Sequence, residues 1–261
     1  MKRGKISTPV KSAVSAAVIF IAAFLIIGYI VVSLKNLDFF KIKDIVLNKP
    51  EETFDSSYLL GRNIFDIDLK KESRQITELY PVYKNIRLFR VMPDRLFITF
   101  TERRPIAYVN LYRYFYVDSE RVLFEPDKSG ENLDLPVIRG LERKIPGPRA
   151  GRQYNIAELA TALSIIEQIG LDSYLKECKI ERIDITEPVN ILCFIRVPDH
   201  DAVPPASWPA VIEVKMAQGG ISDQVHILSG LLAELKEDVN NIKYIDLRFK
   251  EPVIRFNKGK G

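Results

Sequence analysis

The sequence has few of the residues on which active sites and covalent scaffolds depend. It contains two cysteines and two histidines in 261 residues. Two cysteines cannot make a disulfide framework, and Cys178 and Cys193 do not form a C-x-x-C site. Cys193 lies in an apolar run, so we expect two buried, unpaired thiols rather than a bridge.

Common catalytic motifs are also missing from the sequence. It has no G-x-S-x-G elbow, no H-E-x-x-H zinc motif and no P-loop. Carboxylate pairs such as Asp66 and Asp68 could act as acid and base on a glycan, but Asp68 is better explained as a helix cap. We therefore expect a non-enzymatic protein without a metal, a cofactor or a small-molecule substrate.

Charge is absent from residues 12–34. These 23 residues would reach roughly 34 Å as a helix, enough to cross a hydrocarbon core of about 30 Å. A signal peptide would have a shorter apolar region and a small-x-small cleavage site, which Ser33, Leu34 and Lys35 do not supply. The stretch also lacks the polar face of an interfacial helix. It therefore predicts a transmembrane helix.

The charges around this helix predict its orientation. Four basic residues precede it without an acidic partner, namely Lys2, Arg3, Lys5 and Lys11, whereas mixed charges follow it. The positive-inside rule then places the N-terminus in the cytoplasm and the rest of the chain outside. Beyond the helix, the remaining 34 of the 38 Lys and Arg balance all 34 Asp and Glu. A neutral external part lacks the basic field that nucleic-acid binding requires.

The external residues, 35–261, are enough for two small cores. The first part reads as a compact α+β unit because strand, helix and hairpin signals follow one another closely. Asp68 and Pro81 bound a helix with an apolar stripe. The expected elements are a strand at 40–47, a helical turn at 53–60 closed by Gly61, the helix at 68–80, and strands at 82–91 and 95–102.

The second part reads as a mostly β domain with two helices. Asn155 and Glu158 form a capping-box pattern before the first helix, and Gly170 stands where that helix would end. A Pro-rich stretch at 198–209 predicts a long surface loop. The expected strands lie within 106–124 and at 135–140, 180–185, 189–197, 210–216, 242–249 and 253–256, and the second helix at 221–235.

Seven short motifs stand in a fixed order behind the predicted transmembrane helix. They are Phe40-x-Ile42-x-x-Ile45-Val46, Gly61-x-Asn63-Ile64-Phe65-x-Ile67-Asp68, Tyr80-Pro81-Val82-x-x-x-Ile86, Arg90-Val91-Met92-Pro93-Asp94-Arg95-Leu96-x-Ile98, Thr101-Glu102-Arg103-Arg104-Pro105-Ile106-Ala107, Val117-Asp118 and Tyr244-Ile245-Asp246-Leu247-Arg248-Phe249. In this order they resemble the bacterial cell-division family FtsQ, called DivIB in many Gram-positive lineages. The Pro-rich stretch at 198–209 and Pro252 depart from the family pattern.

The resemblance implies a domain organisation. It assigns residues 1–11 to a cytoplasmic tail, 12–34 to the transmembrane helix, 38–106 to a polypeptide-transport-associated (POTRA) domain, 107–256 to a β domain and 257–261 to a C-terminal tail. It further implies a single-pass protein of the cytoplasmic membrane at the division septum, with both domains extracytoplasmic.

The family's role implies a non-catalytic scaffold of the cell-division machinery. Such a scaffold would hold the FtsB/FtsL pair, also called DivIC/FtsL, and so help position and regulate the septal peptidoglycan synthase. Two other classes stay open. A membrane-anchored cell-wall hydrolase would need a catalytic constellation, and a translocation or secretion adaptor would use the POTRA domain as a chaperone.

The last two predicted strands are the expected partner site, because a final strand is often an edge strand that can pair with a partner. Pro252 suits an edge or a bend, since it lacks a backbone donor. The candidate contacts are Phe249, Lys250, Val253, Ile254, Arg255 and Phe256. A second candidate is the joint between the domains, at Glu102, Arg103 and Pro105. From its charges alone, this cluster would be a solvated strand end. The family resemblance implies that it is the joint between the two domains.

Overall fold

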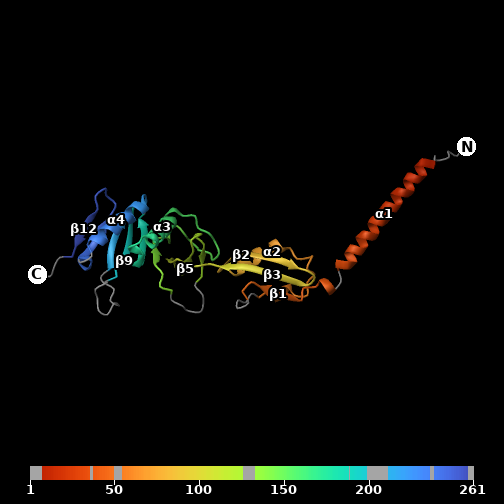
Figure 1. Cartoon of the computed structure of the whole chain (residues 1–261), viewed down its shortest axis with the longest axis horizontal. Helices are drawn as coiled ribbons and strands as arrows, with labels where there is room; N and C mark the ends of the chain where they lie inside the picture. Colours follow the sequence, from red (N-terminus) through yellow and green to blue (C-terminus); the bar gives the residue numbers. More distant parts are fainter. Residues whose placement is uncertain are drawn as a thin grey trace. The chain divides into compact units, whose positions relative to one another are not determined.

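The fold is known from a computed structural model that describes residues 8–35, 38–49, 55–125, 133–187, 189–198, 211–235 and 238–257. The chain forms two compact units (Figure 1). The first unit is Met1–Leu79 with Tyr83–Thr101, and the second is Tyr80–Val82 with Glu102–Gly261. Together they give the mixed α+β fold that the sequence predicts. Of the predicted tails, residues 1–7 and 258–261 lie outside the described residues, as do residues 199–209 of the Pro-rich stretch.

The first helix, α1 (Thr8–Lys35), includes all of the uncharged stretch at 12–34. The side chains that are described along it, such as Phe20 and Phe24, are strongly exposed. Among the described residues, no helix meets the length and hydropathy of a membrane-crossing segment. The transmembrane assignment therefore stays a prediction. The side chains of Lys2, Arg3, Lys5 and Lys11, on which the orientation depends, lie outside the described residues.

The rest of the first unit is a small sheet with one helix. Its elements are η1 (Asp38–Phe40), β1 (Asp44–Leu47), η2 (Ser57–Leu59), α2 (Leu69–Leu79), β2 (Tyr83–Val91) and β3 (Arg95–Glu102). The sheet order is β1-β3-β2, and β1 runs parallel to β3. Ile76 of α2 is buried, as are Ile86 and Leu88 of β2, so the apolar stripe of the helix shares a core with the sheet.

Local signals explain the bounds of α2. The Asp68 carboxylate accepts hydrogen bonds from the backbone N–H groups of Lys70 and Lys71, at 3.0 and 3.2 Å, which confirms the predicted N-cap. Pro81 follows the last turn and prevents continuation. Gly61 has a φ of 75°, as the predicted left-handed closure requires.

The second unit contains two α-helices and a nine-stranded sheet. Its elements are β4 (Ala107–Asn110), β5 (Tyr114–Val117), β6 (Leu123–Phe124), β7 (Val137–Arg139), α3 (Ala157–Leu171), η3 (Leu175–Glu177), β8 (Lys179–Glu187), β9 (Asn190–Arg196), β10 (Val211–Met216), α4 (Ile221–Glu234), η4 (Val239–Asn241), β11 (Ile242–Asp246) and β12 (Val253–Phe256). The sheet order is β12-β11-β10-β9-β8-β7-β4-β5-β6. Three neighbouring pairs are parallel, β4 with β7, β7 with β8 and β10 with β11.

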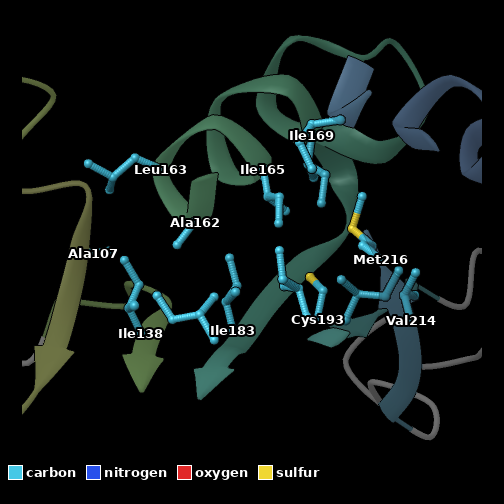
Figure 2. Close-up of a cluster of buried hydrophobic side chains, with 14 of the residues drawn as sticks. Ala107, Ile138, Ala162, Leu163, Ile165, Ile169, Ile183, Cys193, Val214 and Met216 are labelled. Carbon is cyan, nitrogen blue, oxygen red and sulfur yellow. The ribbon is translucent and has the colours of Figure 1, made fainter. Parts of the chain in front are cut away.

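One face of this sheet carries an apolar row in continuous register. From β5 to β12 the row is Phe115, Val109, Ile138, Ile183, Cys193, Val214, Ile245 and Ile254. Figure 2 shows Ile138, Ile183 and Cys193 facing helix α3. Helices α3 and α4 bury their apolar side chains against this row, which makes one core.

The opposite face carries a second row, which includes all nine strands. From β6 to β12 it is Phe124, Tyr116, Tyr108, Val137, Arg182, Phe194, Glu213, Tyr244 and Arg255. The side chains at the β5–β6 end are buried, whereas those from Tyr108 to Arg255 are half-buried or exposed. We call the face with this second row the polar face of the sheet.

The predicted capping box of α3 is wrong. Helix α3 begins at Ala157, and the residue before it, Ile156, makes no side-chain cap. The Asn155–Glu158 pattern fails because the helix starts one residue too late for Asn155 to be the N-cap. Gly170 is not the C-terminal cap either, since the helix continues to Leu171 and the N–H of Asp172 still bonds the Gln168 carbonyl.

Candidate partner-binding edge

Strand β12 lies at one edge of the nine-stranded sheet, and no strand pairs with its outer side in the part of the chain that the structure describes. It runs antiparallel to β11, with Ile254 opposite Ile245 and Phe256 opposite Ile242. The Asn257 N–H donates to the Asn241 carbonyl at 2.7 Å, so the Phe256–Ile242 pair is of the non-hydrogen-bonded kind. The backbone N–H and C=O of Phe256 therefore point away from β11, toward the free edge.

Most side chains of β12 are exposed to solvent. Of its four residues, all described, Ile254 packs against the core, while Val253, Arg255 and Phe256 are exposed. Phe256 is 44% exposed and Val253 47% exposed. An edge that combines exposed apolar side chains with free backbone groups is suited to pairing with an extended segment of another protein.

The loop between β11 and β12 is fixed by one arginine. Arg248 donates from Nε and Nη2 to the two carboxylate oxygens of Asp246, at 2.9 and 2.6 Å, and from Nη1 to the Asn190 side chain at 3.1 Å. The Asp246 pKa lies below its usual value, mainly because Arg248 bonds the charged form. This bidentate pair holds the chain as it leaves the sheet.

The predicted strand at 242–249 is therefore wrong beyond Asp246. The chain bends at residues 248–251, where Arg248 turns back onto Asp246. Phe249 consequently lies in the loop and is 59% exposed, rather than at the end of an alternating strand. Lys250 is also exposed in this loop. All six predicted contact residues thus belong to the β11–β12 hairpin, four of them in the edge strand.

One residue beside the edge was missed from the sequence. The ring of Tyr244, on β11, lies under two cations, with Lys215 Nζ 4.4 Å and Arg255 Cζ 6.0 Å from its centroid. The register explains the arrangement, because Tyr244 pairs with Arg255 and with Glu213, two residues from Lys215. The alternation of side chains along β11 indicated that Tyr244 lies on the face opposite Ile245. It did not indicate that β10 and β12 would be the neighbouring strands.

The second candidate, the predicted joint, is a buried ionic cluster within the second unit. Arg103 is 9% exposed and donates from Nη1 to Asp118 at 2.5 Å and to Glu120 at 3.0 Å. Its Nε donates to the Pro81 carbonyl at 3.2 Å, and its backbone N–H donates to the Val82 carbonyl at 2.8 Å. Asp118 in turn accepts the backbone N–H groups of Glu120 and Val122.

This geometry overturns the reading of 102–105 as a solvated strand end, at least for Arg103. Its partners Asp118 and Pro81 were not predicted as site residues, although both lie in the motifs Val117-Asp118 and Tyr80-Pro81-Val82. Three motifs that are distant in the sequence therefore meet at one guanidinium. Glu102 is exposed and Pro105 half-buried, and the cluster does not include the side chain of Pro105.

The two thiols are unpaired and weakly acidic. Cys178 and Cys193 are both free, as predicted, and burial raises the pKa of each to about 12. Cys178 is half-buried rather than fully buried. Within the described ranges, no group of three or more His, Cys, Asp or Glu side chains could hold a metal ion.

Comparison with known proteins finds several similar proteins that share the name cell division protein FtsQ. No protein-family model matches the chain. The cell division protein FtsQ of Syntrophotalea carbinolica is 25% identical over 194 residues, which are 74% of this chain and 64% of that protein. FtsQ of Geotalea daltonii is 25% identical over 195 residues, 74% of this chain and 65% of the relative. FtsQ of Koribacter versatilis is 24% identical over 198 residues, which are 75% of this chain and 52% of that protein.

The matched part thus spans about half to two thirds of the length of these curated relatives. Several independent relatives share the name, and the ordered motifs point the same way. Over about three quarters of its length, the chain is thus similar to several bacterial cell division proteins named FtsQ.

Proposed function

We propose that the chain is a non-catalytic scaffold of the cell-division machinery that binds an FtsB-like and FtsL-like coiled-coil pair at the edge of its nine-stranded sheet. Through that pair it would help position and regulate the septal peptidoglycan synthase. In this proposal α1 anchors the chain in the cytoplasmic membrane, and the first unit is a POTRA domain that offers a second docking surface.

The observation that carries the proposal is the exposed edge strand β12. Its outward backbone groups can extend the sheet by one partner strand, which gives affinity from main-chain hydrogen bonds. Its exposed Phe256 and Arg255 belong to the aromatic and arginine residues that are enriched at interfaces, and Val253 adds exposed apolar surface beside them. The relatives named FtsQ supply the biological setting.

The test is capture of the purified FtsB/FtsL-type pair by the full-length chain in detergent. Phe256→Asp and a truncation after Phe249 should both abolish capture. Tyr112→Asp is the matched control, because Tyr112 is 68% exposed in the loop between β4 and β5, six strands from β12 in the sheet order. The control should bind as the wild type does.

Circular dichroism must show that each variant is folded. Wild-type affinity in both edge variants would reject β12 as the site and leave the first unit as the next candidate. Capture of a translocation channel in place of the coiled-coil pair would favour the adaptor class. A periplasmic reporter fused after Gly261 tests the anchor separately, since it should be active only if α1 crosses the membrane with its N-terminus in the cytoplasm.

A further inference from the structure

Two arginines on the polar face of the nine-stranded sheet form no ion pair with any residue that the structure describes. Arg139 lies on β7 and Arg182 on β8, and both are half-buried. The Nε atoms of both are buried and have no hydrogen-bond partner among the described residues. A buried donor without an acceptor destabilises the folded chain, and more so when it carries charge, so its presence needs an explanation.

The register brings these two side chains together. Arg139 pairs with Asp184, and Arg182 lies two residues before Asp184 on the same face of β8. With strands about 4.8 Å apart and two residues of rise, the Cα atoms of the two arginines lie about 8 Å apart. Long side chains reach across such a diagonal. Two like charges are therefore held close on one surface.

Asp184, the carboxylate that pairs with Arg139 across the two strands, bonds a neighbouring residue on its own strand instead. Asp184 accepts hydrogen bonds from the backbone N–H and the hydroxyl of Thr186, at 3.0 and 2.6 Å, and forms no ion pair with Arg139 among the described contacts. Arg196, on β9, also has a buried Nε, but its charge is balanced because the Glu181 carboxylate lies 2.7 Å away. Arg139 and Arg182 thus differ from Arg196, because no described carboxylate balances their charge.

An aromatic side chain holds one of the two guanidinium groups in place. The Cζ atom of Arg182 lies 3.9 Å from the centroid of the Phe194 ring, which it faces across β8 and β9. Stacking fixes the plane of the guanidinium and leaves its edge free to donate. Tyr108, on the other side of Val137 in the same row, is half-buried and places a second aromatic ring on this surface.

From this geometry we propose a carboxylate-binding site on the polar face, formed by Arg139 and Arg182 and backed by Phe194. Its occupant is an acidic segment of a partner protein that presents Asp or Glu side chains to the two guanidinium edges. Each carboxylate would accept bidentate hydrogen bonds, which neutral donors or a single lysine cannot match.

The composition of the surface favours a protein over a polyanion. Arginine, tyrosine and phenylalanine together are the residues enriched at protein interfaces. A nucleic acid or a polyphosphate would need a broad basic field, whereas this face also carries Asp184, Glu213 and Asp246. The site is also separate from the edge strand, because β8 is four strands from β12 in the sheet order, about 19 Å away.

The test uses a fluorescein-labelled hexaglutamate peptide and the full-length chain in nonionic detergent. Anisotropy should show saturable binding at about 50 mM salt that weakens as salt screens the charges. The double variant Arg139→Met/Arg182→Met should weaken binding at least about tenfold, because both bidentate donor groups are lost. Arg143→Met is the matched control, since Arg143 is exposed in the same unit, and it should bind as the wild type does.

Three results would overturn the proposal. The first is equal binding by the double variant and the control. The second is displacement of the peptide by inorganic phosphate at the same carboxylate-equivalent concentration, which would indicate a site for free anions. The third is a melting temperature far below that of the wild type in the double variant, which would indicate a structural role for the arginines. A melting temperature equal to or above the wild-type value supports the proposal, because the substitutions remove unsatisfied buried donors.

Discussion

Arg103 and Asp118 form an almost fully buried ion pair, with 2.5 Å between Nη1 and the carboxylate. Removal of one partner from such a pair leaves a buried charge without compensation, which typically costs about 3–5 kcal/mol. We therefore expect Arg103→Met to lower the free energy of unfolding of the second unit by about 3 kcal/mol.

Urea unfolding followed by circular dichroism measures this loss. The control is Arg113→Met, which breaks the exposed pair between Arg113 and Glu125 and should cause no measurable change. If both variants unfold at the wild-type midpoint, the Arg103 cluster is not a stabilising element. The wider idea that this cluster acts as a joint between two domains stays a prediction.

The Asp246–Arg248 pair should make the free energy of unfolding decrease as the pH becomes acidic. The pKa of Asp246 is lowered from its ordinary value of 3.8, chiefly by the Arg248 hydrogen bonds. A lowered folded-state pKa contributes stability above the unfolded value, and that contribution is lost as pH falls below about 4. The drop in urea midpoint from pH 7 to pH 3 should be larger for the wild type than for Arg248→Met. Equal drops would mean that the pair contributes nothing to the pH dependence.

Cys193 should tolerate no hydroxyl at its position. The thiol is fully buried in the apolar row between Ile183 and Val214. Cys193→Ser places a polar group there without a partner, and we expect a loss of about 1–3 kcal/mol in chemical denaturation. Alkylation of the native protein at pH 8 should be slow, because burial raises the thiol pKa to about 12. Rapid labelling before unfolding would contradict this.

Gly140 should be intolerant of a side chain for two reasons. Its φ is 94°, and a Cβ atom there would lie 2.3 Å from the Thr186 backbone nitrogen. Gly147 has a φ of 74° but open space around it. Gly147→Ala should therefore cost only about 1 kcal/mol of strain, and Gly140→Ala clearly more, because the strand must move. Equal thermal shifts for the two variants would argue against the clash.

Local signals predicted the elements of the fold well, and long-range pairing could not be predicted. Asp68 and Pro81 bound a helix through contacts within a few residues, so the sequence shows both ends. The placement of β4 beside β7, and of β11 beside β10, depends on parallel pairing between distant segments, which leaves no local pattern. The start of α3 was also ambiguous, because Asn155 and Ile156 were both possible residues before the first helical turn.

The same distinction applies to the candidate sites. The edge position of β12 followed from its place at the chain end and from Pro252. The loop position of Phe249 did not follow, because the bend depends on Arg248 and Asn190, which are 58 residues apart in the sequence. Likewise, charge alone indicated solvent for Arg103, and only the folded chain brings Asp118 and Pro81 to it.

The strands from β7 to β12 stand in the sheet in the same order as in the chain. As the chain is synthesised, each new strand of this series can therefore add to the one completed before it, and β12 is the last of the series. A partner strand bound at its free edge would continue this series as a tenth strand. The binding surface at β12 would then be complete only when the whole second unit has formed, so a half-made chain would lack this edge.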